Sequence, residues 1–219
     1  MTIYRIPQKL KAIIFDIDST LYSNKEYAFE QNDVQIRRFA TLNNMSNEKA
    51  RTLISSYQTE WSKLHSGSTI SLSNTLLDFG ISIDESIKWR KELIHPENFL
   101  KEDKNLQKTL KELSENCKLL CLTNNPVLVG YHTLEALGID GFISEVIGLD
   151  TTHQSKPSLK SFELTIQRAG CPVENCLSVG DRYTIDIELP LEMGMGGILV
   201  DSVEDVYKLK KVLDFSLQS

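Results

Sequence analysis

Side chains that could bind a divalent cation and a phosphate group stand after or close to short apolar runs of the chain. They are carboxylates, a hydroxyl, an amide and an ammonium: Asp16, Asp18, Thr123, Asn124, Lys156, Asp181 and Asp186. Carboxylates that meet raise one another's pKa unless a cation compensates their charge. Mg²⁺ suits such a group, because it takes one or two carboxylates, keeps waters and accepts phosphate oxygens. A lysine adds a positive charge, and a threonine hydroxyl with backbone N–H groups suits phosphate oxygens. The residue types therefore predict magnesium-assisted chemistry on a phosphate.

The predicted elements bring these groups to one place. Apolar runs that are too continuous to alternate predict strands buried in a parallel sheet, at residues 12–15, 118–122, 143–147, 177–179 and 197–200. Helical patterns separate the later four runs, and strands that alternate with helices are typical of an α/β fold with a doubly wound parallel sheet, a Rossmann-like core. In such a sheet the functional groups gather at the carboxyl ends of the strands. We therefore expect one site at that edge.

A long helical segment separates the first predicted strand from the second. Its periodicity predicts helices at residues 27–42, 46–64, 74–79 and 84–94. A crossover in a compact sheet needs only one helix, so this stretch indicates an inserted domain. The sequence predicts a catalytic core made of residues 1–21 and 99–219, with a helical cap domain at residues 22–98. The N-terminal residues are expected to be a short lead-in to the first strand.

Taken together, the motifs resemble those of the haloacid dehalogenase-like hydrolases. In order they are FDIDSTL, the hydroxyl in LTNN, the lysine in SKPSLKSF and the acidic SVGDRYTID. The insertion after the first motif is similar to the helical cap of that family, so the resemblance covers the whole chain. A single DxDx[ST] match occurs by chance in many proteins, whereas four ordered motifs beside predicted strand ends are specific. One departure is IELPLEMGM, where Pro190 is expected to kink or shorten the predicted helix 184–193.

The resemblance implies a role for each of these side chains. Asp16 would be the nucleophile that becomes an aspartyl phosphate, and Asp18 the general acid and base. Mg²⁺ would be held by Asp16, the backbone carbonyl of Asp18 and Asp181, with Asp186 supporting these ligands. Thr123 and Asn124 would bind the transferring phosphoryl group, and Lys156 would offset its charge. The second aspartate of the first motif favours phosphoryl chemistry over carbon–halogen cleavage.

The substrate is expected to be a small phosphate ester. The first motif and the stretch from LTNN to IGLD resemble the pyrimidine 5′-nucleotidase-like branch, which suggests a nucleoside 5′-monophosphate. Sugar-phosphate and phosphoglycolate phosphatases share the same scaffold. Tyr22 and Asn24 are candidates for contacts with the organic part, and Arg182 for an anionic substrate or an ion pair. The alternatives are a phosphotransferase or sugar phosphomutase of the same fold, or a non-catalytic binding protein.

Composition narrows the class of protein. With 24 Lys+Arg and 30 Asp+Glu, the chain has a net charge of −6 and no basic footprint for a nucleic acid polymer or an anionic membrane. The apolar runs are too short to span a bilayer, and no secretory segment is recognisable, so we expect a cytoplasmic monomer or homodimer. The four cysteines lack the spacing of zinc knuckles and are expected to be small buried hydrophobes.

Overall fold

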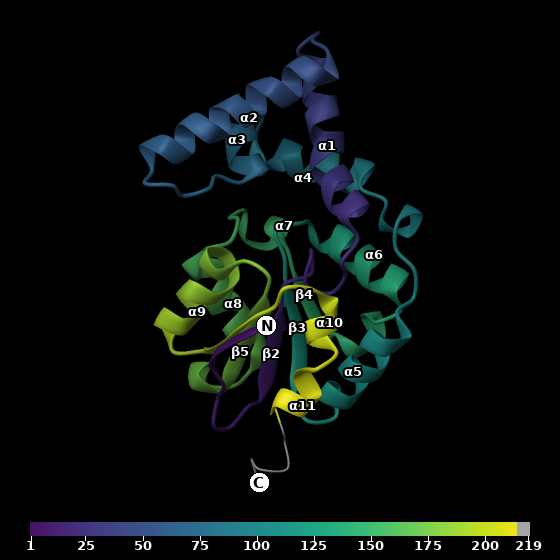
Figure 1. Ribbon diagram of the computed structural model, residues 1–219, viewed down its shortest axis with the longest axis vertical. Helices are drawn as coiled ribbons and strands as arrows, with labels where there is room; N and C mark the ends of the chain where they lie inside the picture. Colours follow the sequence, from purple (N-terminus) through teal and green to yellow (C-terminus); the bar gives the residue numbers. More distant parts are fainter. Residues whose placement is uncertain (214–219) are drawn as a thin grey trace.

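A mostly parallel sheet forms the centre of the molecule (Figure 1). The computed structural model describes residues 1–213. In that range the sheet has 6 strands in the order β1-β6-β5-β2-β3-β4. The strands are β1 (Thr2–Arg5), β2 (Ala12–Phe15), β3 (Lys118–Leu122), β4 (Glu145–Ile147), β5 (Cys176–Gly180) and β6 (Gly196–Leu199). All neighbouring pairs are parallel except β1 with β6. The predicted α/β fold with a doubly wound parallel sheet is confirmed.

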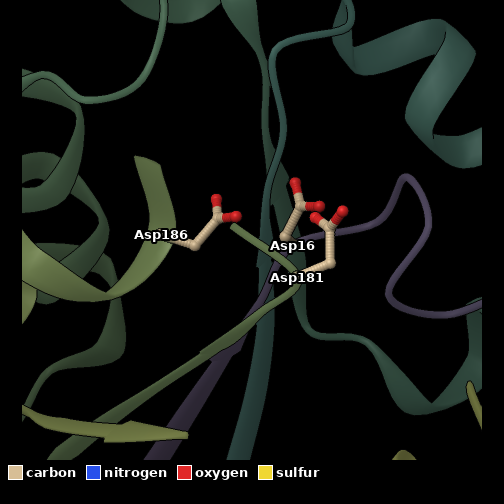
Figure 2. A group of neighbouring side chains, drawn as sticks. All are labelled: Asp16, Asp181 and Asp186. Atoms are coloured by element: carbon tan, nitrogen blue, oxygen red, sulfur yellow. The ribbon is translucent and has the colours of Figure 1, made fainter. Parts of the chain in front are cut away.

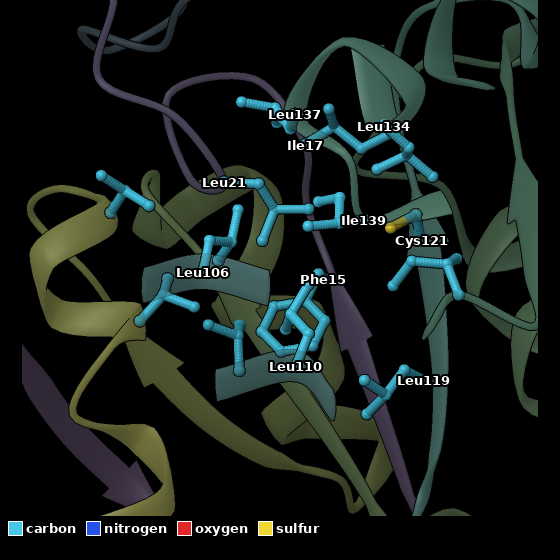
Figure 3. Packing of buried hydrophobic residues seen from close by; sticks show 14 of the residues in the cluster. Phe15, Ile17, Leu21, Leu106, Leu110, Leu119, Cys121, Leu134, Leu137 and Ile139 are labelled. Carbon is cyan, nitrogen blue, oxygen red and sulfur yellow. The ribbon is translucent and has the colours of Figure 1, made fainter. Parts of the chain in front are cut away.

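Helices cover both faces of the sheet, because alternate residues of each central strand point to opposite sides. On one face Phe15 packs with Leu106 and Leu110 of α5 (Lys104–Ser114), as Figure 3 shows. The same face carries α6 (Val127–Leu137), α10 (Val203–Val206) and α11 (Leu209–Leu213). On the other face Ile14 packs with Phe162 of α8 (Leu159–Ala169). The strands are therefore buried on both sides, as their continuous apolar sequences require.

Two predictions about the sheet were wrong in detail. The N-terminal residues are not a simple lead-in, because Thr2–Arg5 pair antiparallel with β6 as the edge strand β1. All four of its residues are exposed, so this strand lacks the buried apolar run from which the other strands were predicted. The strand predicted at residues 143–147 is shorter, since β4 begins at Glu145 after the 3₁₀ turn Asp140–Phe142.

Four helices lie beyond the carboxyl ends of the strands, at the upper end of the view in Figure 1. They are α1 (Lys25–Leu42), α2 (Asn47–Leu64), α3 (Leu72–Asp78) and α4 (Ile83–Leu93). Ser46 caps α2, because its side chain accepts a hydrogen bond from Lys49 N. Phe39, Ile54, Leu76 and Trp89 belong to a small apolar core of these helices. We refer to α1–α4 and their loops as the cap; the predicted domain boundaries stay predictions.

An ion-pair group around the buried carboxylate of Asp33 ties α1 to α2 within the cap. Asp33 accepts hydrogen bonds from Arg51 Nε at 2.6 Å and Nη2 at 2.9 Å, and it also pairs with Arg37. The hydrogen bonds from Arg51 hold the pKa of Asp33 below its usual value. The two long helices are thereby fixed side by side.

The segment after β5 differs from a plain helix. Residues Tyr183–Ile187 form a π-helical turn, and α9 (Glu188–Met193) follows it. Pro190 is the third residue of α9, where a backbone N–H has no partner within the helix, so it is tolerated there. The helix that contains Pro190 is thus shorter than the predicted helix 184–193, as expected. Another brief helix, α7 (Leu149–Thr152), follows β4. Within residues 1–213, none of the helices combines the length and hydropathy that a membrane crossing needs.

Candidate active site

Three carboxylates converge at the carboxyl ends of two adjacent strands (Figure 2). Asp16 follows β2 and Asp181 follows β5, and these strands pair in parallel with Phe15 opposite Val179. Asp186 comes from the π-helical turn. One oxygen from each carboxylate lies within 4.8 Å of the others. Sheet register therefore brings together acids that lie far apart in the sequence.

Lys156 lies between two of these acids. Its Nζ is 2.6 Å from Asp16 Oδ1 and 2.7 Å from Asp186 Oδ1, and all three side chains are only 2% exposed. Burial raises the pKa of Asp16 to about 7 although the lysine opposes this shift. For Lys156 itself burial favours the neutral form, but the two carboxylates outweigh it and raise the pKa of the lysine. The structure thus places this lysine at the acidic cluster, and its catalytic role stays a prediction.

Asp181 has one carboxylate oxygen that accepts no hydrogen bond. Its Oδ1 is buried and forms no hydrogen bond, and burial raises the pKa of the group. Arg182 Nε lies 3.7 Å away, beyond hydrogen-bond distance, and about half of the Arg182 side chain is exposed. An unsatisfied carboxylate oxygen among two further acids is a donor set of hard oxygen atoms, which fits Mg²⁺ or a similar cation. The residues are thus compatible with the magnesium that the sequence resemblance implies.

Donors surround the carboxylate of Asp18. Tyr22 Oη at 2.8 Å and Gln31 Nε2 at 3.0 Å donate to Oδ1. Asn125 Nδ2 at 2.9 Å and Thr123 Oγ1 at 3.2 Å donate to Oδ2. These four hydrogen bonds fix the orientation of the carboxylate, and one of them comes from the cap helix α1. The backbone turns immediately afterwards at Ser19, whose φ of 62° lies in the left-handed region.

The structure places Thr123 and Asn124 at the end of β3, next to the acids of β2. The Asn124 amide holds the neighbouring loop, since its Oδ1 accepts from Lys156 N at 2.6 Å. Thr123 Oγ1 accepts from Asn125 N at 3.1 Å while it donates to Asp18. Their expected contacts with a phosphoryl group stay predictions.

Sequence reasoning missed a buried arginine that connects the cap to the core. Arg90 of α4 donates from Nη1 to Asn125 Oδ1 at 2.6 Å and from Nη2 to Ser73 Oγ of α3 at 2.9 Å. It is 7% exposed, its Nε has no hydrogen-bond partner, and burial lowers its pKa to about 10. Asn125 also donates to Gln31 Oε1 at 2.5 Å, so a continuous network leads from Arg90 to Asp18.

No local signal could have identified Gln31 or Arg90, because tertiary packing of the cap places both. Asn125, in contrast, stands inside the LTNN motif and could have been assigned from it. Of the two suggested substrate contacts, Tyr22 is buried and bonded to Asp18. Asn24 caps α1 by accepting from Tyr27 N at 2.9 Å and donates to Phe99 O at 2.9 Å. Both side chains are therefore occupied by hydrogen bonds within the protein.

Two cavities lie between the cap and the acidic cluster. The smaller, of about 240 Å³, is lined by Asp18, Gln31, Arg90 and Asp181 among others. The larger, of about 480 Å³, extends from Lys156 and Asn124 to α1, α2 and α3. Arg182 lines both. A substrate in this space would have one end at the acids and Lys156 and the other under the cap.

Comparisons with known proteins agree with this geometry. The curated glyceraldehyde 3-phosphate phosphatase of Methanothermobacter thermautotrophicus is 30% identical, over 88% of this chain and 86% of its own length. The 5-amino-6-(5-phospho-D-ribitylamino)uracil phosphatase of Escherichia coli is 23% identical, over 89% of this chain and 85% of its own length. A solved structure, a HAD phosphatase from Thermococcus onnurineus, has a TM-score of 0.63 at 20% identity and covers 94% of this chain and 98% of its own, which shows the shared fold.

These relatives confirm that the chain is an enzyme, a phosphoric monoester hydrolase. The profile of the haloacid dehalogenase-like hydrolases matches residues 10–194. The chain therefore belongs to the family of haloacid dehalogenase-like hydrolases.

Proposed function

We propose that this protein is a Mg²⁺-dependent phosphatase that hydrolyses a small phosphomonoester through an aspartyl phosphate on Asp16. One observation carries the proposal: oxygens of Asp16, Asp181 and Asp186 lie within 4.8 Å of one another, and Lys156 Nζ is 2.6 Å from Asp16. Such an arrangement holds a nucleophilic carboxylate beside positive charge and leaves other acids for a cation.

In the first step a carboxylate oxygen of Asp16 attacks phosphorus, and the bond between phosphorus and the ester oxygen breaks. Asp18 acts as the general acid and gives a proton to the leaving oxygen, so that a neutral alcohol departs. Lys156 offsets the negative charge of the transferring group and orients Asp16. Thr123 and Asn124, together with nearby backbone N–H groups, bind the phosphoryl oxygens.

In the second step Asp18 takes a proton from a water molecule, whose oxygen attacks the phosphorus of the aspartyl phosphate. The bond between phosphorus and Asp16 breaks, phosphate leaves, and both aspartates return to their starting forms. The hydrogen bonds from Tyr22, Gln31 and Asn125 keep Asp18 directed toward this reaction.

We propose Asp16, the backbone carbonyl of Asp18 and Asp181 as the groups that hold Mg²⁺, with Asp186 supporting them. The cation, when bound, neutralises charge on the phosphate and orients it for in-line attack. The buried Asp181 Oδ1, which accepts no hydrogen bond, supports this assignment.

The substrate within this class is a separate question. The relatives named above act on glyceraldehyde 3-phosphate and on a phosphorylated ribitylaminouracil. A nucleoside 5′-monophosphate, which the resemblance to pyrimidine 5′-nucleotidases suggested, is a further candidate. A mutase or phosphotransferase would need to exclude water from the second step. Action in the cytoplasm and a monomeric or homodimeric state stay predictions.

The test is phosphate release from a panel of phosphate esters, with and without a chelator. We expect Asp16→Asn to lower kcat by about 10⁴-fold or more, as loss of a nucleophile does. Asp140→Asn, an exposed carboxylate away from the acidic cluster, is the matched control. Mass spectrometry of the acid-quenched wild type should show one added phosphoryl group that the Asp16 variant lacks. Unchanged turnover in that variant would rule out the nucleophile, and isomerised ester with little free phosphate would favour a mutase.

A further inference from the structure

The larger cavity has two chemically different walls. On the core side it is lined by the candidate catalytic Lys156, by Asn124 and by Arg182. On the opposite side it is lined by helices of the cap and by the loop that leads to α3. The cavity thus begins beside Lys156 and ends under the cap, and Asp18 and Asp181 line the smaller cavity, which shares Asn124 and Arg182 with it.

The cap wall is neutral and rich in hydrogen-bonding groups. Amides and hydroxyls alternate on it with aliphatic side chains: Asn32, Gln58, Ser71 and Asn74 with Ile36 and Leu72. Among the described residues that line this cavity, Lys156 and Arg182 alone are charged and none is aromatic. The Gln58 side chain donates to Thr75 Oγ1 at 3.3 Å, which leaves its amide oxygen to accept from a ligand.

We propose that the preferred substrate is the phosphate ester of an uncharged polyhydroxylated body longer than a triose, such as a pentitol or pentose phosphate. This inference rests on the proposed phosphatase function. The phosphate lies against Lys156, and the hydroxyl groups of the body exchange hydrogen bonds with Gln58 and Asn74. The aliphatic side chains between these amides contact the C–H faces of the same chain.

Size and charge argue against the other esters. A cavity of about 480 Å³ lies within the range of roughly 300 to 1,000 Å³ that encloses drug-sized ligands, so a triose phosphate would leave most of it empty. A nucleobase gains most from stacking on aromatic rings, and the wall offers none. A second phosphate or a carboxylate would need a cation on the cap wall. Arg90, the buried cation of the cap, lines the smaller cavity and already binds Asn125 and Ser73.

The experiment compares kcat/KM for esters that differ only in the body: glycerol phosphate, a pentitol phosphate, pentyl phosphate and uridine monophosphate. A site built to hydrogen-bond hydroxyl groups rejects the analogue that lacks them. We expect the pentitol phosphate to exceed pentyl phosphate by about 10- to 100-fold, which corresponds to about two or three hydrogen bonds. It should also exceed glycerol phosphate and the nucleotide.

Variants then test the wall itself. Gln58→Leu and Asn74→Leu each remove an amide at nearly constant volume. We expect each to lower kcat/KM for the pentitol phosphate about three- to tenfold, mainly through KM, and to leave glycerol phosphate within about twofold. Gln167→Leu makes the same change on the exposed side of α8, away from this cavity, and should alter neither ester. Asn74 is exposed, so its variant keeps the test decisive if loss of the contact between Gln58 and Thr75 impairs folding.

Each outcome bears on one of the two proposals. Equal rates for pentitol and pentyl phosphate, a preference for the nucleotide, or a uniform loss on all esters in the variants would overturn the inference while the phosphatase function stands. Release of phosphate from none of the esters, together with no phosphoryl adduct on Asp16, would instead overturn the proposed function.

Discussion

Replacing Lys156 by methionine should destabilise the protein, and more so at high pH than at low pH. Lys156 Nζ donates to Asp16 at 2.6 Å and to Asp186 at 2.7 Å, and the variant leaves two buried carboxylates without this cation. Removing one partner of a buried ion pair costs about 3–5 kcal/mol, because the remaining charge is uncompensated. Methionine keeps most of the volume of the lysine stem, so the loss is mainly electrostatic.

Protonation of Asp16 limits this cost. Without the lysine the pKa of Asp16, which burial already raises to about 7 in the wild type, rises further, so above about pH 7 the folded variant keeps a proton that the wild type loses. The penalty of the substitution therefore grows with pH in that range, by up to about 1.4 kcal/mol per pH unit. We expect a loss of about 3–5 kcal/mol at pH 8 that is smaller by about 1 kcal/mol at pH 5.

The assay is urea unfolding of wild type and variant at both pH values, in a chelator so that no divalent cation replaces the lost charge. Lys108→Met, at an exposed position of α5, controls for the loss of a surface charge and should change stability by less than about 0.5 kcal/mol. A penalty for Lys156→Met that is the same at both pH values would refute the electrostatic reasoning, and so would one below about 1 kcal/mol at pH 8.

Three further variants test other parts of the structure. Gln31→Leu removes a hydrogen-bond donor from Asp18, so steady-state kinetics should show kcat lower by about 10- to 100-fold at nearly constant KM. An altered KM with unchanged kcat would contradict a role of Gln31 in positioning Asp18. Gly180→Ala places a methyl group 2.3 Å from Asp186 Cβ, so the free energy of unfolding in urea should fall by about 1–3 kcal/mol and the activity should be reduced. Wild-type stability and activity would show that the turn at Asp186 can relax. Asp33→Asn should lose about 1 kcal/mol at neutral pH, because its arginine partners are partly exposed. Those partners lower the pKa of Asp33, so the difference in unfolding free energy between wild type and variant should vanish as acid protonates the wild-type carboxylate. A difference that persists at low pH would exclude the ion pairs as its cause.

The sheet and the acidic cluster could be predicted because their signals are local. Asp16 and Asp181 each follow an apolar run that is too continuous for any element but a central parallel strand. Once two such strands are neighbours, the residues after their ends must meet. The edge strand β1 could not be predicted in this way, since its backbone pairs with β6 while its side chains stay exposed.

The cap contribution to the site escaped prediction for a different reason. Gln31 and Arg90 stand on helices whose existence the periodicity predicted, but the angle at which these helices cross the core depends on tertiary packing. Neither residue belongs to a motif, and a buried arginine such as Arg90 cannot be distinguished in sequence from an exposed one such as Arg38 of α1. Asn124 illustrates the converse case, because its motif was evident while its hydrogen bond to the Lys156 backbone was not.

The two chain segments that join the cap to the core touch each other. The Asn24 side chain donates to the carbonyl of Phe99, 75 positions later, and the rings of Tyr27 and Phe99 stack with centroids 5.6 Å apart. Relative to the sheet, the cap is therefore an insertion whose two ends meet at one point, as the two ends of a surface turn do. Doubling the length of a closed loop costs only about 0.6 kcal/mol in entropy. A junction of this kind therefore allows one cap to be replaced by another in evolution, and one substrate by another, with little effect on the folding of the sheet.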